Sequence, residues 1–183
     1  MRRTMMPMIL AGLLTLALAI PAAGAMFSRG TFADAGTDAY ACGDAEISVA
    51  WEGSGKFHLR TGKGDLDSFF FEHVNFAFHE VHTNLDTGQS FSISGRVVDK
   101  EIKATHVGGT VFETTRIIAG QHLTVRDSDG RVVLQDRGVV VVTYLFDTLG
   151  DAVPGGHFLE ELSVELRGHF PSSDLDICQL WDQ

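Results

Sequence analysis

The sequence predicts an all-β fold in which eight or nine antiparallel strands follow one another as a meander and close into a small barrel. Three observations support this. Apolar and polar residues alternate with period two along most of the chain, and the segments between are short and rich in turn residues. Beyond the first 25 residues, no stretch of about 12 residues has an apolar stripe with helical spacing. Without crossover helices, the sheet is expected to be antiparallel.

Composition narrows the function classes. The 183 residues are 44% apolar and 21% charged, which is typical of a single globular domain. The formal net charge is −10. Because nucleic acids and anionic lipid surfaces attract basic proteins, neither is an expected partner. The sequence contains neither a nucleophile motif nor a glycine-rich phosphate-binding loop followed by a helix. No cofactor is expected.

Residues 1–25 have the layout of a secretory signal peptide. Arg2 and Arg3 precede an apolar run that reaches Ile20, and small residues follow up to a cleavage site expected after Ala25. An uncleaved anchor is the alternative, because the uncharged run is long enough to span a bilayer. It would be the only expected contact with a membrane. Cleavage is favoured, and it predicts a protein that is secreted or held in the cell envelope. The protein is expected to be a monomer.

Export changes the interpretation of the two cysteines. Cys42 lies near the start of the mature chain and Cys178 near its end. In an oxidising compartment such an isolated pair usually forms a disulfide. Its loop would contain nearly the whole domain and contribute about 5 kcal/mol in the chain-entropy model. Residues 26–44, rich in Gly, Ala, Asp and Thr, are expected to be a flexible lead-in to a single β-barrel domain, 45–183.

The strand assignments rest on alternation and residue type. Ile47, Val49 and Trp51 alternate with polar or small residues. The run 69–83 is long, aromatic and free of Gly and Pro. The run 139–145 begins with four valines, whose branched side chains favour a strand over a helix. In chain order, the predicted strand segments are 47–51, 57–59, 69–83, 91–97, 111–118, 123–125, 132–134, 139–145 and 158–166.

The connections between these segments favour hairpins. Residues 84–88 include Asn, Asp and Gly, which favour a turn. Asp129-Gly130 is among the stronger hairpin signals. A longer loop is expected at 149–156. An antiparallel meander of this length can remove its exposed edges by closing into a barrel. A β-sandwich is the alternative, but it needs crossover connections that short hairpin loops disfavour.

The sequence Asn-Leu-Asp-Thr-Gly-Gln-Ser at 84–90, with the strand 91–95 after it, resembles a group of small exported actinobacterial proteins without assigned function. The tail 176–180 and the early Cys42 are similar to the end-to-end cysteine pair of that group. Their fold resembles the calycin and allene-oxide-cyclase-like barrels. The resemblance implies a small apolar cavity and no transferable catalytic residue. The chain departs from the group in its His- and Phe-rich segment 69–82.

Aromatic residues mark a candidate ligand-binding face. Val74, Phe76 and Phe78 share one face of a predicted strand, and Glu80 continues it. Such a face either packs as a core, which is the favoured interpretation, or lines a cavity for an apolar ligand, as in small barrels that hold one molecule. The candidate lining comprises Phe76, Phe78, Phe112, Arg116, Tyr144, Phe146 and Glu160.

Two charged residues of this candidate lining interrupt apolar segments. An inward Arg116 would anchor the carboxylate of a ligand, whereas an outward Arg116, the favoured arrangement, would belong to a solvated strand face. Glu160 is expected on the apolar face with Phe158 and Leu162. A buried carboxyl there would have a raised pKa and would serve as a proton donor, and a position near a barrel mouth, where water reaches the side chain, explains Glu160 equally well.

The eight histidines do not form a recognisable metal motif. His73 and His79 share a strand face but lie about 20 Å apart at roughly 3.3 Å per residue, and His82 points to the other face. No metal is expected. The alternative is a site assembled across strands, from His79, His106 or His122 with Glu80.

Together these observations predict a secreted, non-enzymatic β-barrel protein that binds a small apolar or amphiphilic ligand or serves as a cell-envelope accessory protein. The alternative is a cofactor-free cyclase or isomerase acting inside the barrel. A continuous cavity with one or two inward polar groups would favour binding or cyclase chemistry. A barrel filled by Phe and Val side chains would favour a structural or protein-interaction role.

Overall fold

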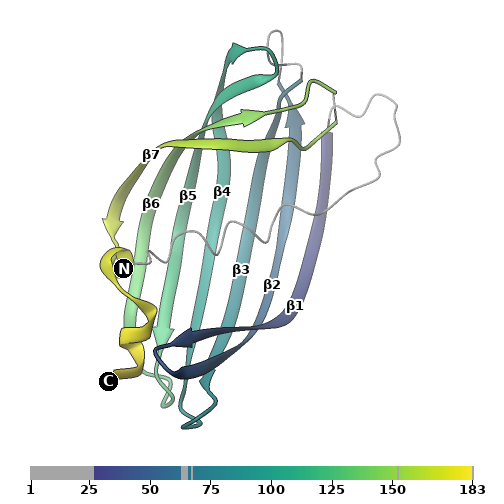
Figure 1. Cartoon of the computed structure of the whole chain (residues 1–183). Coiled ribbons are helices and arrows are strands. Elements are labelled where there is room, and N and C mark those ends of the chain that lie inside the picture. The colour runs from purple at the N-terminus through teal and green to yellow at the C-terminus, as the bar shows by residue number, and fades with distance from the viewer. Residues whose placement is uncertain (1–26, 63–65, 67, 152, 183) are drawn as a thin grey trace.

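The computed structural model describes residues 27–182 except 63–65, 67 and 152. The predicted signal peptide, 1–25, lies outside the described residues. Seven antiparallel strands form one sheet in which each strand pairs with the next along the chain (Figure 1). This meander confirms the antiparallel all-β class that the alternation predicts.

The strands are long, with 13 to 19 residues each. Two short 3-10 helices follow the last strand, and together they form the C-terminal segment. In chain order the elements are β1 (Phe27–Cys42), β2 (Ala45–Thr61), β3 (Phe70–Asn84), β4 (Ser90–Gly108), β5 (Val111–Arg126), β6 (Val132–Asp147), β7 (His157–His169), η2 (Pro171–Asp174) and η3 (Ile177–Asp182).

The sheet has seven strands rather than eight or nine, because several predicted segments belong to one strand. Segments 47–51 and 57–59 both lie in β2, and β5 and β6 each join two predicted segments in the same way. Gly53 and Gly55, expected in a turn, lie in the middle of β2 and pair with residues of both β1 and β3. Pairing on both sides keeps the chain extended through these glycines.

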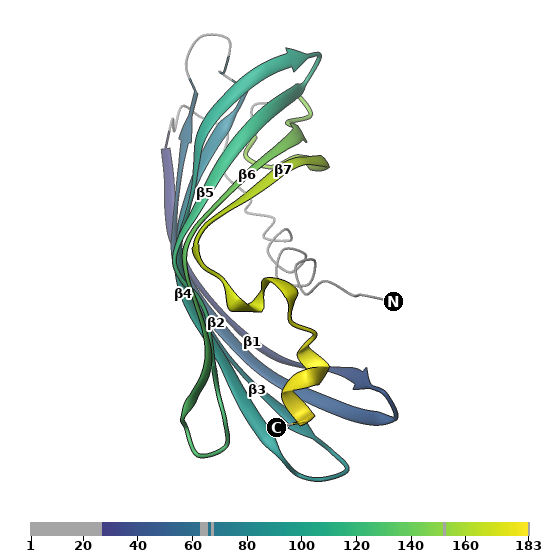
Figure 2. The ribbon, with the colours of Figure 1, turned by 90° about the vertical axis from the view of Figure 1, so that its left-hand side faces the viewer.

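Hydrogen bonds do not close the sheet into the predicted barrel. Within the described residues β1 pairs only with β2, and β7 pairs only with β6. The sheet is strongly curved, with a concave and a convex face (Figure 2). Long strands and short hairpins fit a curved open sheet as well as a barrel, because neither determines whether the first and last strands meet.

The first strand occupies residues 27–42, where the sequence predicts a lead-in and no strand. Its Gly, Ala and Asp content gives it a low β-propensity. Every residue from Phe27 to Cys42 nevertheless pairs with β2. Pairing with a neighbouring strand therefore outweighs local propensity here.

A row of glycines crosses three strands of the sheet. Gly120 of β5 pairs with Gly138 of β6, which pairs with Gly168 of β7. Their φ angles are 134°, 150° and 143°, a region that side chains rarely allow. A Cβ atom at Gly138 would lie 2.4 Å from the carbonyl oxygen of Arg167. Glycines in such positions let a sheet curve, and this row separates two halves of the concave face.

The C-terminal segment lies on the concave side of the sheet (Figure 2). Its η3 packs over one half of the concave face, which we call the covered half, and the rings of Trp181 and Phe91 are 4.6 Å apart there. The residues of η3 in this contact are Ile177, Leu180 and Trp181, and they pack against Phe91, Ile93, Leu123 and Val125.

The predicted disulfide is confirmed. Cys42 at the end of β1 is bonded to Cys178 of η3, with the two Cα atoms 5.4 Å apart and a separation of 136 in the sequence. The bond therefore attaches η3 to the edge strand β1 and holds it over the covered half.

The concave face beyond the glycine row is the open half. It includes Tyr144 and Phe146 of β6, and it is covered in part, because Phe69 packs against Phe112 and Phe146 there. Phe158 and Leu166 of β7 pair with Phe146 and Val140, and their side chains remain 48% and 42% exposed. Exposed apolar side chains on a concave surface make this half the candidate for a contact site.

Candidate functional site

One charged network interrupts the open half. Asp99 and Glu101 of β4 alternate onto the concave face, and Glu101 pairs with Arg116 of β5. Val74 of β3 pairs with Asp99, and Glu72 lies two residues before Val74 on the same face. Three carboxylates therefore meet one guanidinium within an otherwise apolar surface.

The Arg116 guanidinium is the centre of this network. Its Nε lies 3.2 Å from Asp99 Oδ1, while its Nη2 lies 3.3 Å from Glu72 Oε2 and 3.5 Å from Glu101 Oε1. Its Cζ lies 5.6 Å from the centroid of the Tyr144 ring. The side chain is only 19% exposed. A ligand carboxylate would have to displace one of the protein's own carboxylates to reach it.

Glu101 is the most buried carboxylate of the network. One of its oxygens accepts a hydrogen bond from the Tyr144 hydroxyl, and the other accepts the backbone N–H of Glu72 at 2.8 Å. The pairing of β3 with β4 ends nearby, at His73 and Lys100. The Glu101 side chain thus replaces a backbone partner where these two strands part.

Burial raises the pKa of two of the carboxyl groups. The pKa of Asp99 is raised to about 6, because burial disfavours its charge, while Arg116 opposes part of this effect and Glu101 adds to it. The pKa of Glu72 is also raised, mainly by burial. Three carboxylates outnumber one guanidinium, so the network carries excess negative charge when these groups are ionised.

The same surroundings keep Tyr144 and Arg116 protonated. Burial raises the pKa of Tyr144, and the charge of Glu101 raises it further. Burial alone would lower the pKa of Arg116, but Asp99 and the other acids raise it overall. Tyr144 therefore acts as a hydrogen-bond donor and Arg116 as a fixed cation. The groups that can exchange a proton are the carboxyl groups whose pKa is raised, Asp99 and Glu72.

Four residues of the predicted cavity lining come together in the open half. Arg116 and Tyr144 belong to the network, and Phe112 and Phe146 pair with each other across β5 and β6. Arg116 lies on the concave face rather than in the favoured outward arrangement, because Phe112, Thr114 and Arg116 alternate along β5.

The other three predicted residues lie elsewhere. Phe76 stacks on Phe32 of β1, with ring centroids 5.9 Å apart, and Phe78 packs against the core of the covered half. Glu160 is exposed and pairs with Leu145, whose neighbours in β6 face the concave side. A register shift between β6 and β7 therefore separates Glu160 from the concave face.

The three acidic partners of Arg116 were not predicted as site residues. A signal for two of them is present in the sequence, since the apolar alternation through Ile93 and Val97 continues into Asp99 and Glu101. The alternation places these acids on an apolar face. It does not reveal the cation that meets them, because that depends on the register between β4 and β5.

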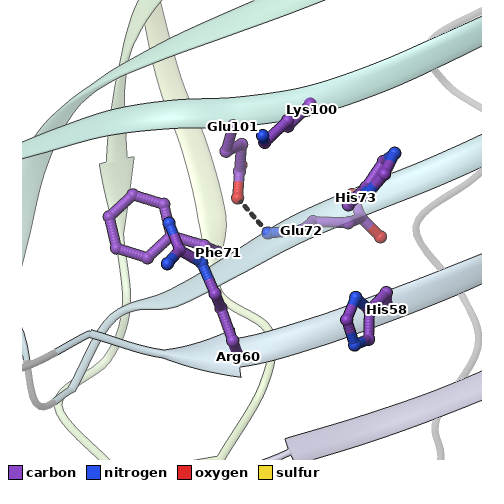
Figure 3. A pocket seen from close by; sticks show the side chains of 7 residues that line it. All are labelled: His58, Arg60, Phe71, Glu72, His73, Lys100 and Glu101. Atoms are coloured by element: carbon purple, nitrogen blue, oxygen red, sulfur yellow. Dashed lines mark hydrogen bonds between the residues drawn. The ribbon is translucent and has the colours of Figure 1, made fainter.

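A pocket of about 260 Å³ opens where β3 and β4 part (Figure 3). His58, His73 and Lys100 are neighbours across three strands and alternate with concave-face residues, so they lie on the convex face. The Arg60 guanidinium lies 4.8 Å from the centroid of the Phe71 ring. The lining residues are His58, Arg60, Phe71, Glu72, His73, Lys100 and Glu101.

A second polar cluster lies in the covered half. His82 is buried, with its Nδ1 3.1 Å from the Tyr40 hydroxyl and its Nε2 3.0 Å from Glu80 Oε2. Burial raises the pKa of Tyr40 to about 12, so this hydroxyl stays protonated. Phe91 stacks on the His82 ring and Trp181 packs on Phe91. The cluster links β1 to β3 beneath the C-terminal segment, which is a structural role.

The remaining histidines do not assemble into the alternative metal site. His106 and His122 each bond through Nε2 to a backbone carbonyl, at 2.8 and 3.2 Å. His79 lies on the convex face and Glu80 on the concave face. In the described part of the chain, no three His, Cys, Asp or Glu residues are arranged to hold a metal ion.

Comparison with protein families, with curated proteins and with solved structures finds no match for this chain. The resemblance to small exported actinobacterial proteins therefore stays a prediction. The disulfide is typical of an oxidising, extracytoplasmic environment. Among the described residues, no helix has the length and apolar character needed to cross a membrane.

Proposed function

We propose that this protein binds a small amphiphilic molecule on the open half of its concave face, without catalysing a reaction, outside the cytoplasm. The observation that carries the proposal is one charged network set among exposed apolar side chains of the same concave surface. Such a network adds little to the stability of a core, because the free energy needed to remove charges from water is often larger than the free energy gained when they pair. An amphiphile can use both parts of the surface.

The apolar body of the ligand would rest on β6 and β7. The Tyr144 ring lies 5.8 Å from the ring of Phe158 and 6.4 Å from that of Phe146. Leu166 extends this surface towards the glycine row. Docking an apolar body here removes the exposed side chains of Phe158 and Leu166 from water, at about 25 cal/mol per Å² of apolar surface.

The polar head of the ligand would be a cation or a hydrogen-bond donor. The guanidinium of Arg116 is already occupied by carboxylates of the protein. The excess charge on Asp99 and Glu72 offers acceptors to an amine or a hydroxyl and repels a carboxylate. The role predicted for an inward Arg116, anchoring a ligand carboxylate, is therefore replaced by a preference for a ligand head of the opposite charge.

The fluorescent apolar probe N-phenyl-1-naphthylamine tests the apolar part of the proposal. We expect it to bind the wild-type protein, and Leu166→Ser should weaken its binding several-fold. Val98→Ser is the matched control, because Val98 is 40% exposed against 42% for Leu166 but lies on the convex face. Absence of probe binding to the wild-type protein, or equal effects of the two substitutions, would contradict the proposal.

Native mass spectrometry of protein purified from its own host provides an independent check. A co-purified amphiphile of defined mass would support the proposal. The same spectrum tests the predicted monomeric state. A ligand whose only charged group is a carboxylate would count against the proposed preference for a donor head.

The raised pKa of Asp99 supports a second candidate function, that of a cofactor-free isomerase or cyclase. A carboxyl group whose pKa is about 6 can exchange its proton near neutral pH, as a general acid or base does. Mass analysis of the bound ligand after incubation separates the two candidates. Conversion by the wild-type protein but not by Asp99→Asn would favour the enzyme, whereas recovery of unchanged ligand would favour simple binding.

A further inference from the structure

The pocket on the convex face carries an inference that is independent of the amphiphile site. We propose that this pocket binds a tetrahedral oxyanion, the phosphate or sulfate group of a ligand. The proposal rests on four basic side chains that converge on one small cavity in a protein of net charge −10. They are His58, Arg60, His73 and Lys100.

The strand register brings these groups together. His58 of β2 pairs with His73 of β3, which pairs with Lys100 of β4, so the three form one row across the sheet. Neighbouring strands lie about 4.8 Å apart, so the row spans roughly 10 Å. Arg60 follows His58 by two residues on the same face. Figure 3 shows these side chains, from three neighbouring strands, around one opening.

Arg60 and Lys100 supply the permanent charges. Among the residues that the structure describes, neither has a carboxylate within salt-bridge distance. The ring of Phe71 lies 4.8 Å from the Arg60 Cζ and helps to orient the guanidinium. An oriented guanidinium presents a planar set of donors that suits phosphate and sulfate oxygens.

Two acidic residues, Glu72 and Glu101, also line the pocket, and Arg116 offsets part of their charge. Glu72 and Glu101 turn their carboxylates towards Arg116 on the concave side, and Glu101 also accepts bonds from the Tyr144 hydroxyl and the Glu72 N–H. The pocket therefore combines four basic side chains with two carboxylates that are engaged with Arg116.

The size of the pocket limits what it can hold. At about 260 Å³ it lies below the range of roughly 300–1,000 Å³ that accommodates drug-sized ligands. An oxyanion with a few water molecules fits this volume, while the rest of a larger ligand would remain outside the pocket.

Titration of ¹⁵N-labelled protein with sodium phosphate and, separately, with sodium sulfate tests the proposal, with sodium chloride holding the ionic strength constant. We expect saturable shifts of the amide signals around the pocket. Arg60→Gln and Lys100→Gln should each weaken binding about five-fold, the upper end for one exposed charge pair. Arg96→Gln is the control, because Arg96 is exposed on the same face of β4 but does not line the pocket.

The anions distinguish the sources of the oxyanion. Saturation by phosphate alone supports a phosphate-bearing ligand, and saturation by sulfate alone supports a sulfate-bearing one. Shifts that do not saturate, that chloride reproduces, or that persist unchanged in both Arg60→Gln and Lys100→Gln would overturn the proposal. Both substituted residues are exposed, so unchanged thermal unfolding should confirm that the variants are folded.

Discussion

The two halves of the concave face lie on the same strands but are completed differently. In the covered half, η3 packs Trp181 onto an aromatic and aliphatic core, and the disulfide between Cys42 and Cys178 holds it there. In the open half, the strands carry Arg116 with its three carboxylates, and apolar side chains of β7 remain exposed. The difference assigns a stabilising role to the covered half, and we propose that the open half binds a ligand.

Loss of the disulfide should have the largest effect on the covered half. Replacing Cys42 and Cys178 together by Ser should lower the free energy of unfolding by about 5 kcal/mol, because the bond closes a very long loop of the unfolded chain. Urea unfolding measures the change. Under conditions where the variant stays folded, its affinity for N-phenyl-1-naphthylamine should match that of the wild-type protein. Unchanged stability would contradict the role assigned to the disulfide.

Removal of the central cation should destabilise the open half. Arg116→Met leaves three partly buried carboxylates without their counter-charge, and we expect a loss of about 3 kcal/mol near neutral pH. Urea unfolding against Arg167→Met provides the contrast. Arg167 forms a 2.7 Å ion pair with Glu165 on the exposed edge strand β7, so its loss should have no measurable effect. Equal effects would show that the Arg116 network is no more than a surface ion pair.

Trp181→Ala sharpens the separation of the halves. Truncating a Trp in a core costs about 3–5 kcal/mol, and Trp181 is only partly buried, so a loss of about 2 kcal/mol is expected. Near-ultraviolet circular dichroism should report the loss of packing around Phe91. Probe binding in the open half should be retained. A parallel loss of probe binding would place the ligand under η3 instead.

The raised pKa of Asp99 gives the open half its own pH dependence. Because the pKa is about 6 in the folded protein and about 3.9 in an unfolded chain, the folded state binds more protons between these values. Stability should therefore fall as pH rises from about 4 to about 6 and stay lower above that, by about 1–3 kcal/mol. Glu72 contributes in the same direction.

The control for this prediction is Asp99→Asn. Urea unfolding near pH 4.5 and near pH 7.5 should give a smaller difference for this variant than for the wild-type protein. Identical differences in the two proteins would show that Asp99 titrates normally in the folded state.

Much of the scaffold was predictable from the sequence because it depends on local patterns. Period-two alternation and turn residues identify the antiparallel meander, and the isolated cysteines identify the disulfide. The strand at 27–42 was missed because pairing with β2, rather than residue type, makes it a strand. Barrel closure was predicted wrongly, since the meeting of the first and last strands depends on the accumulated curvature of the whole sheet.

The candidate site was predictable only in part. Arg116, Phe112, Tyr144 and Phe146 were identified because polar or aromatic residues stand out in apolar strands. Glu160 was placed on the apolar face because alternation was extended through a register shift that the sequence does not show. The acidic partners of Arg116 come from two other strands and became evident only with the register.

Competition for N-phenyl-1-naphthylamine tests the central claim most directly. Dodecylamine and dodecanoate have chains of equal length and heads of opposite charge near pH 7.5. If the open half combines an apolar surface with excess carboxylate, dodecylamine should displace the probe at a concentration about ten-fold lower than dodecanoate, equivalent to about 1.4 kcal/mol. Asp99→Asn should narrow this ratio. Equal or better displacement by dodecanoate would contradict the account.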